Sequence, residues 1–261
     1  MNRFHALSGI ALVLASTSCS NLDTGGELVH FDAYAAGQPG AASFDNGRGF
    51  HVELTRATMH VGAVYLRLGG INPGSANSSC YGETTYGLEV PGPVDVDTLS
   101  PSLQEFSVGG EGTTDLDESA EIWLTGGDVN AQDDGTVIVD VAGTATRAGA
   151  AYPFESTMTI SDNHAVPPTD PATPGANPIC KQRIIAPIAT AIQPEPGGKL
   201  VLRIDSRAWF QNLDFSTLSP NDLDPSVLVI PDDSKPGAGL TFFDGVTGNS
   251  ASTYQFSWTL P

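Results

Sequence analysis

The sequence predicts an all-β protein, a mostly antiparallel β-sandwich with long Pro/Gly-rich loops and few or no helices. Hydrophobic and polar residues alternate along much of the chain, whereas sustained helical spacing of hydrophobic residues is almost absent. The chain also contains 29 glycines and 19 prolines, which favour turns and strand ends. Because 40% of the residues are hydrophobic, we expect a packed core rather than a disordered chain.

The first nineteen residues have the layout of an export signal. Arg3 lies in a short head, an apolar stretch runs from Leu7 to Ala15, and small polar residues precede Cys19. This stretch is too short to span a bilayer, since a membrane helix needs about twenty residues. We therefore expect residues 1–18 to be a signal peptide and not a permanent membrane anchor.

The segment "ALVLASTSCSN" resembles the lipobox of bacterial lipoproteins, in which small residues precede a cysteine that is lipidated. It departs from that pattern at Ser16, where the family prefers leucine. The resemblance implies lipidation of Cys19, a tether over residues 19–27 and attachment to the cell envelope. Ser20 implies sorting to the outer membrane. An ordinary secreted protein cleaved near Ser18 is the alternative.

Two cysteines remain in the mature chain, Cys80 and Cys180. Both lie in segments rich in proline, glycine and asparagine. An exported chain meets an oxidising compartment, so we expect a disulfide between them, with two free thiols as the alternative. No cysteine and histidine spacing indicates a structural zinc site.

The charge of the chain limits its partners. Thirty acidic residues against eleven basic ones give a formal net charge of −19. Such a surface repels phosphate backbones and anionic lipid headgroups, which argues against nucleic-acid binding. Contact with the membrane is therefore expected only through the lipid anchor, and cations remain plausible partners.

Alternation places several strands in the first half of the domain. In "ELVHFDAYA", His30 and Asp32 share one face. The longest strand candidate runs from Phe50 to Gly70. Its hydrophobic residues change faces near Thr55 and Arg56, which predicts a β-bulge or a short bend, a feature common where a strand crosses between sheets.

The second half shows the same pattern. Residues 135–160 predict a long hairpin with its turn near Arg147 to Ala150. Further half-buried strands are expected at 199–205 and 253–261.

We expect residues 28–261 to form one β-sandwich domain. The Pro-rich segment 165–178 fits a long surface loop better than an interdomain linker. "VDVDTLSP" at 94–101 and "LDFSTLSP" at 213–220 share an Asp and Thr-Leu-Ser-Pro at fixed offsets. A faint internal duplication would explain this echo, and common turn chemistry is the alternative.

The chain carries no recognisable catalytic motif. GxSxG, HExxH, P-loop and GxGxxG patterns are absent, and with thirty acidic residues we nominate no catalytic pair.

A transition-metal site is one hypothesis for the histidines. His51 and Glu53 alternate onto one strand face, as do His30 and Asp32. Imidazole and carboxylate suit copper or zinc, so neighbouring strands could bring together His30, His51, Glu53 and His60. Histidines that simply occupy half-exposed strands are the alternative.

A calcium site is a second hypothesis. The loop "DVNAQDDG" offers four oxygen-bearing side chains, from Asp128, Asn130, Asp133 and Asp134. Their spacing differs from the EF-hand pattern. Hairpin turns also collect Asp and Gly for conformational reasons.

A glycan site is a third hypothesis. In "RIDSRAWFQNLDF", Trp209 is flanked by Arg207, Gln211 and Asn212, and an exposed Trp among amides can stack on a sugar ring. Alternatively, Trp209 and Phe210 cap the core of the sandwich.

Together these patterns favour an envelope-anchored lipoprotein that binds a ligand or plays a structural role without turnover. A periplasmic or surface metal-binding protein of the copper type is the runner-up. A hydrolase that acts on envelope polymers is the third alternative.

Overall fold

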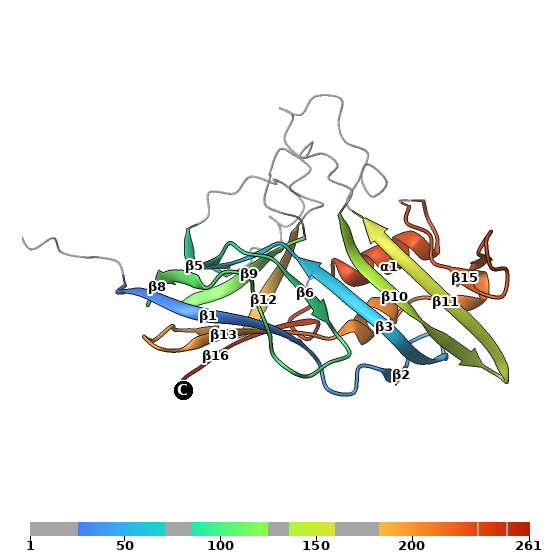
Figure 1. Ribbon diagram of the computed structural model, residues 1–261, viewed down its shortest axis with the longest axis horizontal. Helices are drawn as coiled ribbons and strands as arrows, with labels where there is room; N and C mark the ends of the chain where they lie inside the picture. Colours follow the sequence, from blue (N-terminus) through green and yellow to red (C-terminus); the bar gives the residue numbers. More distant parts are fainter. Residues whose placement is uncertain (1–25, 71–84, 125–135, 160–182, 234, 249) are drawn as a thin grey trace, which may run out of the picture.

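The computed structural model describes residues 26–70, 85–124, 136–159, 183–233, 235–248 and 250–261. Over these ranges the chain is all-β, as predicted, with two mixed sheets and one α-helix (Figure 1). Of the strand pairings in these ranges, β1 with β13 and β11 with β15 are parallel and the others are antiparallel.

The larger sheet has nine strands in the order β12-β9-β4-β5-β8-β1-β13-β16, with β7 paired to β1. Its terminal strands β12 and β16 lie close together, so the sheet is strongly curled. The strands are β1 (Leu28–Gly37), β4 (Ala63–Arg67), β5 (Tyr86–Val90), β7 (Gln104–Glu105), β8 (Gly110–Thr113), β9 (Asp117–Trp123), β12 (Arg183–Ile192), β13 (Lys199–Ile204) and β16 (Tyr254–Thr259).

The smaller sheet has seven strands in the order β14-β15-β11-β10-β3-β2, with β6 paired to β3. The strands are β2 (Ser43–Asp45), β3 (His51–Val61), β6 (Val94–Asp97), β10 (Val137–Arg147), β11 (Ala150–Thr159), β14 (Ser219–Pro220) and β15 (Leu228–Val229). Figure 1 shows this sheet at the opposite end of the long axis from β8 and the start of β1.

The long strand predicted at 50–70 carries both a bulge and a sheet crossing. Ala142 pairs with Arg56 and Gly143 with Leu54, so Thr55 is the extra residue of a bulge. Buried positions change parity there, which confirms the prediction. The crossing between the sheets comes later, at Gly62, which separates β3 from β4.

The predicted hairpin is formed by β10 and β11. Arg147 pairs with Ala150, so Ala148 and Gly149 form a two-residue turn. Both turn residues have positive φ, 52° and 82°. Two positive φ angles are the requirement of a type I′ turn, whose twist matches that of the flanking strands.

One continuous hydrophobic core joins both sheets. The helix α1 (Ala238–Val246) and the 3₁₀ helix η3 (Ser206–Phe210) pack against the smaller sheet through a chain of rings. Phe242 of α1 lies 5.1 Å from Phe210 of η3, and Phe210 lies 5.6 Å from Phe154 of β11, between ring centroids.

The two Thr-Leu-Ser-Pro segments adopt different structures. Residues 94–97 form β6, whereas Phe215–Thr217 form the 3₁₀ helix η4, with Asp214 as its N-cap. The repeated sequence therefore does not correspond to a shared local structure. Along the described ranges, no helix combines the length and apolar character needed to cross a membrane.

Candidate functional site

The 3₁₀ helix η3 forms one wall of a polar cleft. Its N-cap residue, Asp205, accepts a hydrogen bond from the backbone N–H of Arg207. The guanidinium of Arg207 donates to both oxygens of the same carboxylate, at 2.7 and 2.6 Å, and these hydrogen bonds raise the pKa of Arg207. Two buried rings, Trp209 and Phe210, anchor the helix in the core.

Asn46 ties η3 to the turn between β2 and β3. Its Nδ2 donates to the carbonyl oxygens of Phe210 and Leu213, at 3.1 and 2.8 Å. Its Oδ1 accepts from the backbone N–H groups of Arg48 and Phe50. Asn46 is only 6% exposed, so a buried amide with all four of these bonds fixes the position of η3 relative to β2.

The helix α1 supports η3 from the other side. A Cβ on Gly245 would lie 2.4 Å from the carbonyl oxygen of Trp209, so only glycine permits this approach. The segment after α1 then brings the hydroxyl groups of Ser250 and Ser252 to the cleft, 2.7 Å apart.

This η3 cleft has a volume of about 580 Å³, within the usual range of small-molecule sites, roughly 300–1,000 Å³. Phe44, which packs on Phe210, contributes an aromatic side chain to the lining. The other side chains that matter here all carry hydrogen-bonding groups: Asp45, Asp205, Arg207, Gln211, Asn212, Asp244, Ser250 and Ser252. Three carboxylates and one guanidinium give this set two more negative than positive charges.

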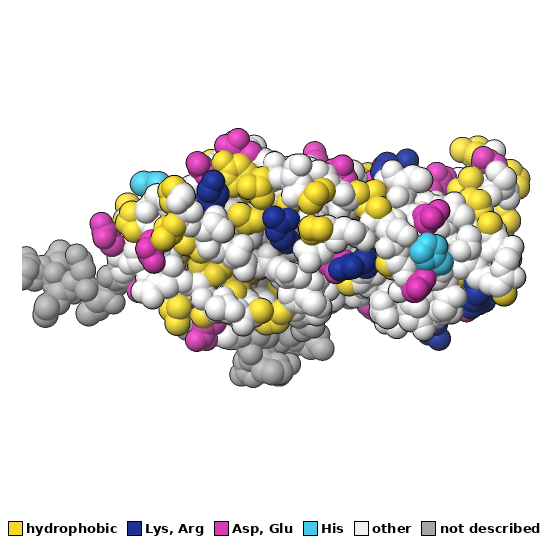
Figure 2. All heavy atoms as spheres, turned by 90° about the horizontal axis from the view of Figure 1, so that it is seen from below, with side chains coloured by type: hydrophobic (Ala, Val, Ile, Leu, Met, Phe, Trp, Pro, Cys, Tyr) yellow, Lys and Arg dark blue, Asp and Glu magenta, His cyan; other side chains and the backbone are white. Residues whose placement is uncertain are grey.

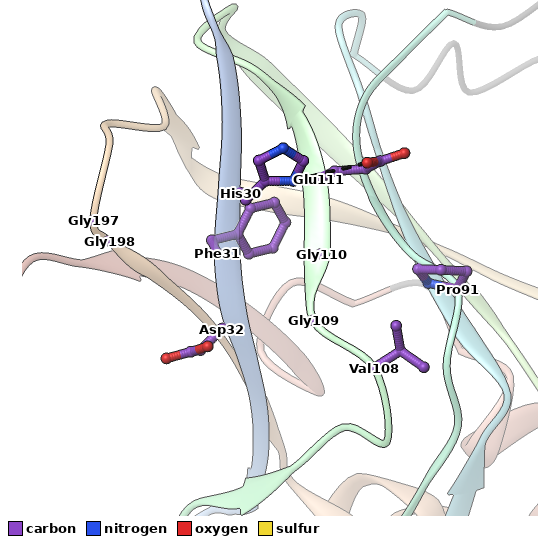
Figure 3. A pocket seen from close by; sticks show the side chains of 10 residues that line it. All are labelled: His30, Phe31, Asp32, Pro91, Val108, Gly109, Gly110, Glu111, Gly197 and Gly198. Atoms are coloured by element: carbon purple, nitrogen blue, oxygen red, sulfur yellow. Dashed lines mark ion pairs between the residues drawn. The ribbon is translucent and has the colours of Figure 1, made fainter.

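A second hollow of about 580 Å³ lies beside β1 and β8 (Figure 3). Four of its ten lining residues are glycines, and Figure 3 shows His30 directed toward Glu111. Phe31 packs edge-on to Trp258, and a Cβ on Gly110 would lie 2.2 Å from the ring of Phe31. The glycines there make room for aromatic rings and have no side chains of their own. This hollow therefore offers fewer side-chain donors and acceptors than the η3 cleft.

A buried ionic network lies on the outer face of the larger sheet. Glu121 of β9 is 0% exposed, and Nη1 of Arg183 lies 3.2 and 3.1 Å from its two oxygens. Arg67 approaches the same carboxylate at 3.5 Å, and the hydroxyl of Tyr86 donates to it at 3.0 Å. Burial, and next the negative charge of Glu121, raise the pKa of Tyr86. The network joins β4, β5, β9 and β12.

Asp117, on the same face of β9, is a second buried carboxyl group. It is 0% exposed, and burial raises its pKa to about 7. The negative charge of Asp115 adds to the rise, and the N–H of Gly87 offsets part of it. Asp117 and Glu121 are four residues apart on one strand, so they are separated by about 13 Å.

The glycan hypothesis for Trp209 is wrong for that residue. Trp209 is 1% exposed, so its ring is part of the core and has no free face for a sugar. The three polar residues that flank it, Arg207, Gln211 and Asn212, do line the η3 cleft. The alternative, in which Trp209 and Phe210 cap the core, is the arrangement observed.

The structure does not bring the four predicted metal ligands together. His51 and Glu53 lie close, with Nε2 of His51 3.8 Å from Oε1 of Glu53. His60 lies nine residues further along β3, about 30 Å away, and pairs with Asp95 of β6 at 2.6 Å. His30 belongs to the larger sheet and faces Glu111 at 3.8 Å.

Histidine, cysteine and carboxylate side chains nowhere gather in a group of three or more suited to a metal ion in the part of the chain that the structure describes. The proposed calcium ligands Asp128, Asn130, Asp133 and Asp134 lie outside the described residues. So do Cys19, Cys80 and Cys180, and with them the expected lipid attachment and disulfide.

Sequence reasoning missed Ser43 and Asp45, which flank His51 across the β2–β3 turn. The signal was present in "SFDNGRGFHVE", where a Gly-rich turn separates two alternating segments and so predicts a hairpin. Nothing in the sequence marks Glu121 or Asp117, because their burial depends on segments far away in the chain.

The chain matches no family model, no curated protein and no solved structure in the three comparisons.

Proposed function

We propose that this protein is an envelope-anchored lipoprotein whose β domain binds neutral polyhydroxylated ligands, that is, glycans, in the η3 cleft. The signal-like start of the chain and Cys19 support the envelope location. The observation that carries the binding proposal is the cleft itself, in which β2, η3, α1 and the segment at 250–253 all contribute hydrogen-bonding side chains.

The chemistry of the lining favours sugars. Amides and hydroxyl groups can each donate and accept, as sugar hydroxyls also do. Gln211, Asn212, Ser250 and Ser252 supply these groups, and all four side chains are partly or fully exposed to solvent. Phe44 offers an apolar contact for the carbon-bound hydrogens of a sugar ring.

The charge of the lining favours a neutral ligand. The lining has three carboxylates, from Asp45, Asp205 and Asp244, but one guanidinium, from Arg207. That guanidinium already donates two hydrogen bonds to the carboxylate of Asp205. Phosphate or sulfate groups would therefore meet repulsion. Figure 2 shows acidic side chains scattered over the face seen from below, and such side chains repel anionic partners.

The walls of the cleft are fixed before a ligand arrives. Asn46 holds η3 through two carbonyl groups, and Gly245 lets α1 pack against the backbone of Trp209. The protein therefore loses little conformational entropy when a ligand binds. A small number of hydrogen bonds can then be enough for measurable affinity.

The proposal is tested by calorimetric titration of the purified protein with neutral oligosaccharides, beside sulfated ones of the same length. We expect binding of neutral members only. Asn212→Ala and Ser252→Ala should each weaken binding about tenfold, the equivalent of 1.4 kcal/mol. Thr157→Ala, an exposed change on β11 outside the cleft, is the matched control.

A thermal-shift screen gives an independent measurement. A ligand at one hundred times its Kd stabilises the folded state by about 2.7 kcal/mol. Equal affinities of the cleft variants and the wild-type protein, or a preference for sulfated ligands, would contradict the proposal.

A further inference from the structure

Three side chains of β2 and β3 have the connectivity of a nucleophile, a base and an orienting acid. The hydroxyl oxygen of Ser43 lies 3.3 Å from Nε2 of His51. The other ring nitrogen, Nδ1, lies 2.8 Å from Oδ1 of Asp45. Asp45 also lines the η3 cleft, so its carboxylate connects the three residues to the proposed ligand site.

Strand pairing builds this arrangement. Asp45 of β2 pairs with His51 of β3, and Ser43 pairs with Glu53. Ser43 and Asp45 are two residues apart and therefore share a face, so Ser43 becomes the diagonal neighbour of His51. Asn46 fixes the turn that joins the two strands, and this sets the register of all three side chains.

The hydrogen bonds select one useful tautomer. When Nδ1 carries its proton and donates to Asp45, Nε2 is unprotonated and accepts the hydroxyl proton of Ser43. Oε1 of Glu53 lies 3.8 Å from the same nitrogen. Thr146 of β10 pairs with His51 on the other side and carries no charge.

A backbone donor lies beside the nucleophile. The N–H of Leu54 donates to the carbonyl of Ala42, and the N–H of Asn46 donates to the carbonyl of Phe50. Backbone groups in an antiparallel pair alternate in direction, so the N–H of Ser43, between these positions, faces away from β3. Because β2 is the last strand of its path in the sheet, this N–H lies on an open edge and can bind an oxyanion.

We propose that Ser43, His51 and Asp45 hydrolyse short acyl esters carried on the hydroxyl groups of a glycan bound in the η3 cleft. The substrate class rests on the proposed glycan-binding function. The hydrolytic centre itself rests on the geometry of the three residues. His51 is 46% exposed and Asp45 83%, so the site is open, which suits a small acyl group on a large polymer.

The reaction proceeds by two acyl transfers. Oγ of Ser43 forms a bond to the ester carbonyl carbon while its proton moves to Nε2 of His51. The carbon–oxygen bond to the sugar then breaks, and the sugar oxygen takes the proton from Nε2. Water attacks the acyl-serine in the same way, its proton passing through Nε2 to Oγ. The products are the carboxylic acid and the free sugar hydroxyl.

Two substrates test the centre with the purified protein. The first is 4-nitrophenyl acetate, whose cleavage needs no glycan binding. The second is an O-acetylated neutral oligosaccharide, with release of acetate followed by NMR. A fluorophosphonate probe should label Ser43, and mass spectrometry of the peptide that contains Ser43 locates the label.

Variants assign the roles. We expect Ser43→Ala to abolish labelling and to lower both rates at least about 100-fold, and His51→Gln to do the same. Asp45→Asn should lower the rates about tenfold, because an exposed carboxylate orients and stabilises the imidazole less than a buried one. Ser226→Ala is the matched control, since Ser226 is an exposed serine whose hydroxyl donates to Asp224 and, among the residues that the structure describes, to no histidine.

The outcomes separate the two proposals. Unlabelled Ser43, or equal rates for the wild-type protein and Ser43→Ala, would overturn the hydrolytic centre while leaving glycan binding to its own titration. Cleavage of 4-nitrophenyl acetate that depends on Ser43, without cleavage of the acetylated oligosaccharide, would overturn the substrate class. Cleavage of both, with Asn212→Ala slowing only the oligosaccharide, would support the whole inference.

Discussion

The carboxylate of Asp117 occupies the space that a side chain on Gly87 would need. A Cβ on Gly87 would lie 2.3 Å from Oδ1 of Asp117. Leu66 pairs with Leu88 and Arg67 with Tyr86, so Gly87 is also the extra residue of an irregularity in β5. The buried acid of β9 and the glycine of β5 therefore depend on each other.

Replacement of Gly87 by alanine should destabilise the protein by about 1–3 kcal/mol, the usual cost of overpacking a tight site. Chemical denaturation measures the change. Gly69→Ala is the matched control, because a Cβ there would meet nothing within 4 Å, and it should alter stability by less than about 0.5 kcal/mol. Equal stabilities of the two variants would show that the Asp117 carboxylate does not fill this space.

The stability of the protein should fall as the pH rises from about 4 to about 7, through the ionisation of Asp117. Its pKa is raised to about 7 in the folded state, from 3.8 in the unfolded chain. Between these values the folded state holds a proton that the unfolded state has lost. The free energy of unfolding therefore decreases by up to about 1.4 kcal/mol per pH unit from this group, and the decrease ends above pH 7.

Asp117→Asn removes this contribution, since an amide does not ionise. Its free energy of unfolding, measured by denaturant titration from pH 4 to pH 7.5, should show a correspondingly flatter profile than that of the wild-type protein. Parallel profiles for the two proteins would be inconsistent with a raised pKa for Asp117.

Removal of Glu121 should be strongly destabilising. Glu121→Ala leaves Arg67 and Arg183 close together without the carboxylate between them, and breaking a buried ion pair from one side costs about 3–5 kcal/mol. Glu118→Ala, an exposed change on the same strand, should have little effect. Similar unfolding midpoints for both variants would argue against a buried network.

Asn46→Ala should cost about 3 kcal/mol, because it leaves the carbonyl groups of Phe210 and Leu213 and two backbone N–H groups without their partner. Asn46→Asp keeps the acceptor oxygen but loses both donors, so it should also be destabilising. Both variants should weaken ligand binding in the η3 cleft as well, since η3 and the residues after it lose two hydrogen bonds to the β2–β3 turn. Unchanged stability of Asn46→Asp would contradict the role of the two donated bonds.

Ala148→Asn should stabilise the protein by about 0.5–1 kcal/mol. Ala148 has a φ of 52° in the β10–β11 turn, a conformation that costs a residue with a Cβ and that asparagine tolerates better. Asn-Gly is also the favoured pair for a type I′ turn. Thermal unfolding measures the gain, and a lower melting temperature for Ala148→Asn would speak against this turn geometry.

The alternation of hydrophobic residues determined the fold class, the β10–β11 hairpin and the bulge at Thr55. These features are local, because side-chain direction in a strand depends only on parity, and a change of parity requires an extra residue. The Gly-rich turn before His51 was equally local and could have predicted the pairing of Asp45 with His51.

Only the tertiary structure decided which polar residues meet. Trp209 has polar neighbours in the sequence, as an exposed Trp often has, yet α1 and β11 enclose η3 and bury it. His30, His51 and His60 formed one hypothetical site, but His30 lies in the larger sheet, and His60 is about 30 Å from His51 along β3. Glu121 and Asp117 are ordinary acidic residues until four strands surround them. Sequence periodicity fixes the face of each side chain. Burial and convergence depend on contacts between distant segments, such as Asn46 with Leu213, 167 residues apart, which no local pattern encodes.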